Sequence, residues 1–77
     1  MRLVDLEINR RAVVTGFDDV PVKIMEMGLM QGTTVEVLRK SRLPKMLLVR
    51  LDGSVVALPL DVAEKIKVEP VYEEKKV

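Results

Sequence analysis

The sequence contains no cysteine, no histidine and no tryptophan, and its only aromatic residues are Phe17 and Tyr72. The absence of cysteine excludes disulfides, and catalysis of the Ser/His or Cys/His type has no imidazole or thiol to use. Structural zinc sites use thiolate or imidazole ligands, which this sequence also lacks. With so few aromatics, a groove for proline-rich peptides and base stacking on single-stranded nucleic acid are both disfavoured. We therefore expect a chain that is not an enzyme and that holds no cofactor.

Long apolar runs and a surplus of charge are also missing. No apolar stretch approaches the ~20 residues needed to span a bilayer, and charged residues at positions 2, 5, 7 and 10 interrupt any signal-peptide core. The 77 residues carry 13 Lys and Arg against 12 Asp and Glu, so a broad attraction to nucleic acid or to an anionic membrane is not expected. The prediction is one small cytoplasmic domain that has no nucleic-acid partner and is not itself embedded in a membrane.

The most informative stretch is residues 20–38, where the apolar period changes from helical to alternating across two glycines. Apolar residues at i, i+4 and i+7 predict a short helix over residues 20–27. Alternating valines then predict a strand over residues 33–40. Gly28 is the expected helix stop, and Gly32 is expected to supply a positive φ for the turn into the strand.

Turn and capping signals predict the other elements. Asp52-Gly53 between two apolar stretches is typical of a type I′ hairpin turn. Asp18-Asp19 are expected to cap the helix that starts near residue 20, and Asp61 with Glu64 resembles a capping box. By residue range, the remaining elements are a strand at 12–15, a loop at 41–45, a hairpin of 46–51 and 54–58, a single-turn helix from 61, and a last strand at 66–68.

Two blocks of the chain resemble the FeoA family, the small ferrous iron transport protein A. Residues 23–29 (KIMEMGL) and 31–37 (QGTTVEV) are similar to its leucine-rich helix, glycine turn and Thr-x-Val-x-Val strand. Residues 49–53 and 56–58, followed by Ala63, Ile66 and Val68, resemble its closing hairpin, short helix and final strand. The opening residues 3–6 also fit, although Gln31 stands where the family usually has proline. The resemblance covers roughly residues 3–69.

Several short strands with tight turns favour a small, strongly bent antiparallel sheet. The predicted fold is mainly β, a small SH3-like barrel of about five strands with two short helices. Residues 1–69 form the domain, and residues 70–77, which have no apolar period, form a flexible C-terminal tail. The side chains expected to point inward are Val13, Ile24, Met27, Leu29, Val35, Val37, Leu47, Val49, Leu51, Val56, Leu58, Val62, Ile66 and Val68.

Strand alternation also leaves apolar side chains without an obvious place in the core. It turns Leu38, Met46, Leu48, Val55 and Ala57 outward, and a contiguous exposed apolar patch marks a binding surface. The predicted partner-binding residues are Leu38, Leu43, Pro44, Met46 and Leu48. Two alternatives stay open: residues 3–6 or the last helix cover this face as a second small core, or a patch at Val22 and Met25 binds the partner instead. The basic cluster at 39–42 with Lys45 is interpreted as a solvated turn, with contact to a phosphate or to an acidic partner as the alternative.

The resemblance implies the function and the partner. It implies a cytosolic accessory protein that supports ferrous iron uptake by contacting the cytoplasmic GTP-binding region of the membrane transporter FeoB. The alternative is a metal-responsive regulatory domain like the SH3-like C-terminal domain of iron-dependent transcriptional repressors. A nucleic-acid-binding small barrel is a third class, which the near-zero net charge disfavours. Oligomeric state is left open, a weak homo-oligomer included.

The scattered carboxylates and the missing histidine and cysteine predict no tight site for ferrous iron or zinc. Calorimetric titration of the chain with either ion should show at most weak, roughly millimolar binding, as unorganised carboxylates give. A stoichiometric site of micromolar affinity would contradict this prediction and support the metal-responsive alternative.

Overall fold

The computed structural model describes the backbone of residues 1–20, 22–26 and 28–71, and the side chains of these residues except that of Ile24. The prediction that Ile24 and Met27 point inward therefore lies outside the described residues. The same holds for the predicted flexible tail beyond Val71.

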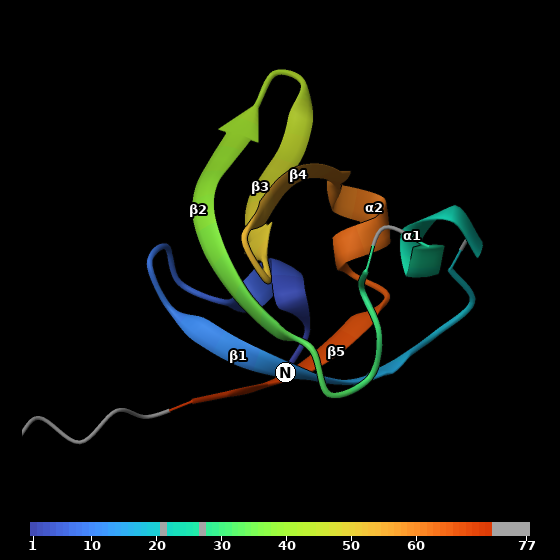
Figure 1. The fold of residues 1–77 in the computed structure, drawn as a ribbon. Coiled ribbons are helices and arrows are strands. Elements are labelled where there is room, and N and C mark those ends of the chain that lie inside the picture. Colours follow the sequence, from blue (N-terminus) through green and yellow to red (C-terminus); the bar gives the residue numbers. More distant parts are fainter. Residues whose placement is uncertain (21, 27, 72–77) are drawn as a thin grey trace, which may run out of the picture.

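A single antiparallel sheet of five strands organises the chain, in the order β4-β3-β2-β1-β5. Figure 1 shows this sheet strongly bent, with the N-terminal helical turn inside the curve. The predicted mainly β fold of about five strands with two short helices is confirmed, and a short 3-10 helix, η1, is added to it. The elements are η1 (Leu3–Asp5), β1 (Arg11–Phe17), α1 (Val22–Glu26), β2 (Thr34–Arg42), β3 (Lys45–Leu51), β4 (Ser54–Pro59), α2 (Leu60–Ala63) and β5 (Ile66–Pro70).

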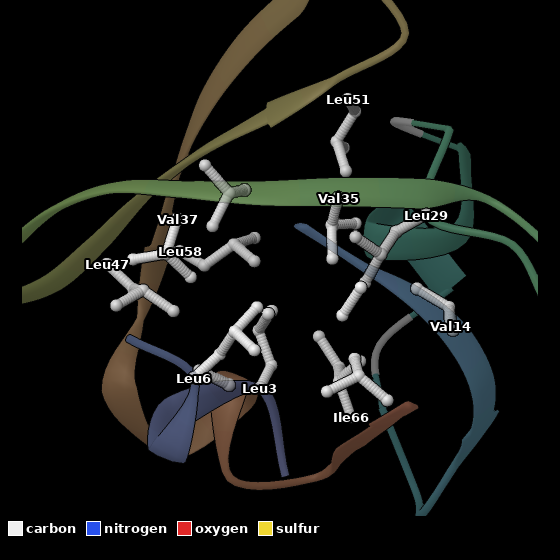
Figure 2. Packing of buried hydrophobic residues seen from close by; sticks show 14 of the residues in the cluster. Leu3, Leu6, Val14, Leu29, Val35, Val37, Leu47, Leu51, Leu58 and Ile66 are labelled. Atoms are coloured by element: carbon white, nitrogen blue, oxygen red, sulfur yellow. The ribbon is translucent and has the colours of Figure 1, made fainter. Parts of the chain in front are cut away.

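The core lies on the concave side of the sheet, where alternate residues of each strand meet. Leu3 and Leu6, at 0% and 1% exposure, reach into its centre from the N-terminal segment, as Figure 2 shows. Ala63 of α2 closes one side and is also fully buried. The sequence patterns missed these three residues because a 3-10 turn and a four-residue helix are too short to display a period. Among the side chains that the structure describes, the buried core is Leu3, Leu6, Ala12, Val14, Leu29, Val35, Val37, Leu47, Val49, Leu51, Leu58, Val62, Ala63, Ile66 and Val68.

Two inward predictions are corrected. Ala12 and Val14 of β1 are buried while Val13 is half-buried, because Ala12 pairs with the inward-facing Val35. A shift of one residue exchanges the two faces of a strand, and three consecutive apolar residues in β1 gave no alternation from which to read the face. Val56 is half-buried at the edge of the core rather than inside it.

The glycine turns have the backbone that the sequence predicted. Gly28 and Gly32 have φ angles of 97° and 92°, and Asp52-Gly53 have 39° and 87°. Thr33 fastens the first turn: its hydroxyl donates a hydrogen bond to the Gly28 carbonyl at 3.2 Å. The Gly32 amide donates to the carbonyl of Val14 at 2.8 Å. These bonds connect the turn after α1 to β1 and hold the buried Leu29 against the sheet.

Several predicted boundaries differ from the structure. The expected loop at 41–45 is a tight turn, since Arg42 pairs with Lys45 and only Leu43 and Pro44, joined by a cis peptide bond, lie between the strands. The last strand runs to Pro70 instead of residue 68. Helix α1 is described over Val22–Glu26, and Val20, where the predicted helix begins, lies outside it.

The capping box is absent from α2. Its N-cap is Pro59, no side chain caps it, and Asp61 lies in the first turn of the helix. The spacing of Asp61 and Glu64 suggested a capping box, but β4 continues directly into the helix, so its last residue, Pro59, occupies the N-cap position.

The Asp18 carboxylate links the N-terminus to the sheet, whereas the predicted cap of α1 falls at a position outside the described residues. Its carboxylate accepts a hydrogen bond from Arg2 at 2.6 Å and lies 3.5 Å from the Lys67 ammonium. The hydrogen bond from Arg2 and the positive charges of Arg2 and Lys67 together hold the pKa of Asp18 below its ordinary value of 3.8, against the opposing effect of desolvation. The cluster joins the residues before η1, the end of β1 and β5.

Replacing Gly28 by alanine should lower the free energy of unfolding by roughly 1–2 kcal/mol through backbone strain. A Cβ at this position would meet no other atom within 4 Å, so crowding adds nothing. Gly16→Ala is the matched control, because Gly16 has no positive φ and its Cβ would lie 3.9 Å from the Lys67 side chain. Urea denaturation should therefore separate the two variants; equal midpoints would contradict the strain at Gly28.

Asp18→Asn should lower the melting temperature at pH 7. A carboxylate with a depressed pKa in the folded state stabilises the fold fully above its ordinary pKa, and this contribution disappears as the pH falls through the lower folded value. The difference between the variant and the wild type should accordingly shrink below pH 3.8. Asp19→Asn makes the same change on the exposed neighbour, which is not part of the cluster, and should leave the melting temperature at pH 7 close to that of the wild type; equal losses for both variants would refute the role of the cluster.

Candidate interaction surface

A β-bulge in β2 determines which side chains reach the outer face of the sheet. Val37 pairs with Val49, but the next aligned pair is Arg39 with Leu48, which leaves Leu38 as the extra residue. A bulge of this kind shifts the alternation of the strand that contains it. Leu38 was predicted to face outward with the other partner-binding residues; in the structure it is half-buried at the bulge.

Beyond the bulge, Arg39 and Ser41 share the outer face with the residues of β3 that they oppose, Leu48 and Met46. Lys40 turns to the inner side, opposite Leu47, and its ammonium donates a hydrogen bond to the Val4 carbonyl at 3.2 Å. The cluster predicted to be a basic loop is thus a strand with alternating cations, one of which is anchored to the N-terminal segment.

The outer face of β2, β3 and β4 contains a shallow hollow of about 240 Å³, which we call the outer hollow. Three of the five predicted partner-binding residues, Pro44, Met46 and Leu48, line it, whereas Leu38 and Leu43 do not. Ala57, which alternation turned outward, completes the apolar floor, and Arg39 and Ser41 contribute polar groups. Sequence alternation missed these two because it contains no signal for the bulge.

The described residues leave the outer hollow uncovered. Leu3 and Leu6, and Val62 and Ala63 of α2, are all buried in the core on the opposite side of the sheet. Neither residues 3–6 nor α2 therefore covers the outer hollow. For the part of the chain that the structure describes, the predicted alternative of a second small core on this face is wrong.

Two further apolar groups are exposed. Leu43, at the turn between β2 and β3, is 93% exposed, and its neighbours Arg42 and Lys45 are exposed as well. On the α1 side of the molecule, Val22 and Met25 are 68% and 43% exposed, so the alternative patch predicted there is accessible in the structure.

The side chains that line the outer hollow suit non-covalent binding of a partner. An apolar floor with a guanidinium at its side can accept an apolar side chain that is followed or preceded by a carboxylate. Among the described residues, no three histidine, cysteine or acidic side chains are grouped so that they could hold a metal ion. No helix in that part of the chain is long and apolar enough to cross a membrane.

Comparison with known proteins identifies the relatives of this chain. Residues 1–70 match the model of the FeoA domain family. The solution structure of FeoA from Chlorobium tepidum is 28% identical, with a TM-score of 0.86 over 97% of this chain and 74% of that one. The crystal structure of a zinc complex of FeoA from Stenotrophomonas maltophilia, described as an SH3 domain protein, is 25% identical, with a TM-score of 0.76 over 90% and 89% of the two chains. The SH3-like character of the fold is thereby confirmed.

A more distant likeness extends to a regulator. A manganese-dependent transcriptional repressor has a TM-score of 0.83 at 19% identity, and the match covers 91% of this chain but only 40% of the repressor. At that identity the likeness concerns the fold alone. No curated protein matches the chain in sequence.

Proposed function

The chain belongs to the FeoA domain family, and we propose that it is a cytosolic, non-catalytic accessory protein that binds the cytoplasmic GTP-binding region of a FeoB-like membrane transporter. A role in ferrous iron transport follows from the family. The S. maltophilia relative, described as a candidate ferrous iron transport activating factor, supports an accessory role. Binding to the transporter goes beyond what the family match supports, and it is the part of the function that we propose.

The observation that carries this proposal is the outer hollow, an apolar site on the sheet that no described element covers. Met46 and Leu48 on its floor are half-buried, so a partner side chain inserted between them would lose most of its contact with water. Burial of one such side chain contributes ~1.5–3 kcal/mol. Micromolar affinity needs about 8 kcal/mol, so the contact must extend beyond the hollow. Methionine suits this position because its flexible thioether adapts to the shape of a partner.

The metal-responsive alternative has weaker support. It depends on a likeness to repressors at 19% identity, whereas the family match covers residues 1–70. Micromolar metal binding by the chain would revive it.

The substitution Ala57→Asp tests the outer hollow. Ala57 is exposed, so folding should tolerate the change, while a carboxylate on the apolar floor should weaken binding to the transporter's GTP-binding region by at least about tenfold. Val55→Asp is the matched control: it places the same charge on the same strand and face, at a residue that is 52% exposed and does not line the hollow.

Binding is measured by calorimetry against the isolated GTP-binding region, and folding by the melting temperature of each variant. Equal affinity for the two folded variants would show that the hollow is not the interface. The same measurement with Val22→Asp would then test the exposed patch on α1.

A further inference from the structure

One hairpin of this chain carries a local excess of positive charge. Residues 37–51 contain five Lys and Arg and no acidic residue, so the rest of the sequence, with eight basic and twelve acidic residues, has a formal charge of −4. A net charge of +1 therefore hides a strong separation of charge. Such a separation orients a molecule in the field of a charged surface.

The most cationic part of this hairpin is also its most exposed end. β1 pairs with β2 only as far as Glu36, so residues 39–42 have β3 as their only strand partner among the described residues. Figure 1 shows the β2–β3 turn extending away from β1 and β5. Within the described part of the chain, Arg42 and Lys45 form no ion pair, and both are exposed.

Leu43 lies between these two cations and is 93% exposed, the highest value among the exposed large apolar residues. It does not line the outer hollow, so a side chain that fills the hollow leaves Leu43 in water. An exposed leucine at the tip of a turn, flanked by cations, matches the chemistry of an anionic bilayer surface. Its side chain can enter the acyl boundary while the cations remain with the headgroup phosphates.

We infer that the β2–β3 turn, with Leu43 between Arg42 and Lys45, docks on an anionic lipid bilayer. The inference goes beyond the proposed protein contact and does not depend on it. The two contacts adjoin each other, because Pro44 belongs to both the turn and the lining of the outer hollow. A partner embedded in a membrane would hold the turn close to that surface.

The same residues fit other anionic partners less well. Single-stranded nucleic acid is held by aromatic stacking platforms, and the hairpin has no aromatic residue. An acidic protein segment would satisfy Arg42 and Lys45 but would gain little from a leucine that projects beyond the sheet. A bilayer accounts for the exposed leucine and for both cations.

The expected affinity is weak on its own. Each cation close to an anionic bilayer strengthens binding by about fivefold, and two cations with one leucine remain well below a stable anchor. Vesicle binding should therefore be reversible, should require anionic lipid, and should decrease as the salt concentration rises.

The first test is co-sedimentation of the full chain with vesicles of phosphatidylcholine containing about 30% phosphatidylglycerol, compared with phosphatidylcholine alone. Binding only to the anionic vesicles is expected. Arg42→Gln with Lys45→Gln should weaken it about 25-fold, as two steps of about fivefold give. Lys23→Gln with Lys65→Gln removes the same charge from exposed residues elsewhere and should leave binding within about twofold of the wild type.

The second test follows Leu43 itself. The chain has no tryptophan, so Leu43→Trp places a single probe at the turn, and its fluorescence should shift to shorter wavelength when anionic vesicles are added. Val55→Trp, on β4 and outside the proposed contact, should show no shift. Leu43→Ser should reduce vesicle binding by about tenfold, with an unchanged melting temperature.

The inference is overturned if anionic and neutral vesicles bind equally, or if the folded Leu43 and Arg42/Lys45 variants bind as the wild type does. A fluorescence response of the Leu43→Trp variant to polyglutamate or to an oligoribonucleotide, but not to vesicles, would also overturn it and assign the turn to that partner instead. None of these vesicles contains the transporter, so the outcome is independent of the proposed protein contact.

Discussion

The packing of Leu3 and Leu6 into the concave side of the sheet is the contact on which the rest of the structure depends. A domain of 77 residues has little interior, and without a disulfide its stability comes from burial of apolar side chains. The bent sheet leaves space at its centre, and these two fully buried leucines fill it. Their segment is secured at its base, where the Val68 amide donates a hydrogen bond to the Met1 carbonyl at 2.8 Å and Asp18 holds Arg2.

Because the core is packed on the concave side, the proposed binding surface stays open. Because the N-terminal segment and α2 both pack inside the bend, the outer face of β2, β3 and β4 has no covering element among the described residues. The bulge at Leu38 then places Arg39 beside Leu48 on the open face and sends Lys40 inward to the Val4 carbonyl. One extra residue in β2 thus separates two neighbouring cations, one of which contributes to the proposed binding site while the other secures the core segment.

The proposed contacts lie next to each other on one hairpin. The outer hollow is apolar with a guanidinium beside it, and the turn beyond it has Leu43 between two cations. A domain that bound both the cytoplasmic region of a membrane transporter and the adjacent bilayer would gain from their proximity, because the first contact raises the effective concentration of the second. Neither contact needs catalysis or a resident metal, in keeping with a sequence that has no histidine or cysteine.

Most of the fold could be predicted from the sequence, because turns and strand periods are properties of neighbouring residues. The positive φ angles at Gly28, Gly32, Asp52 and Gly53 depend on local backbone preference, and the alternation of β3 specified its buried face correctly. What only the tertiary structure decided are the features that depend on distant contacts: the face of β1, the filling of the core by Leu3 and Leu6, and the bulge at Leu38. The lining of the outer hollow shows the same division. Alternation predicted that Met46 and Leu48 face outward, but Arg39 joins them only because pairing with β3 shifts by one residue, and no pattern within β2 itself specifies that shift.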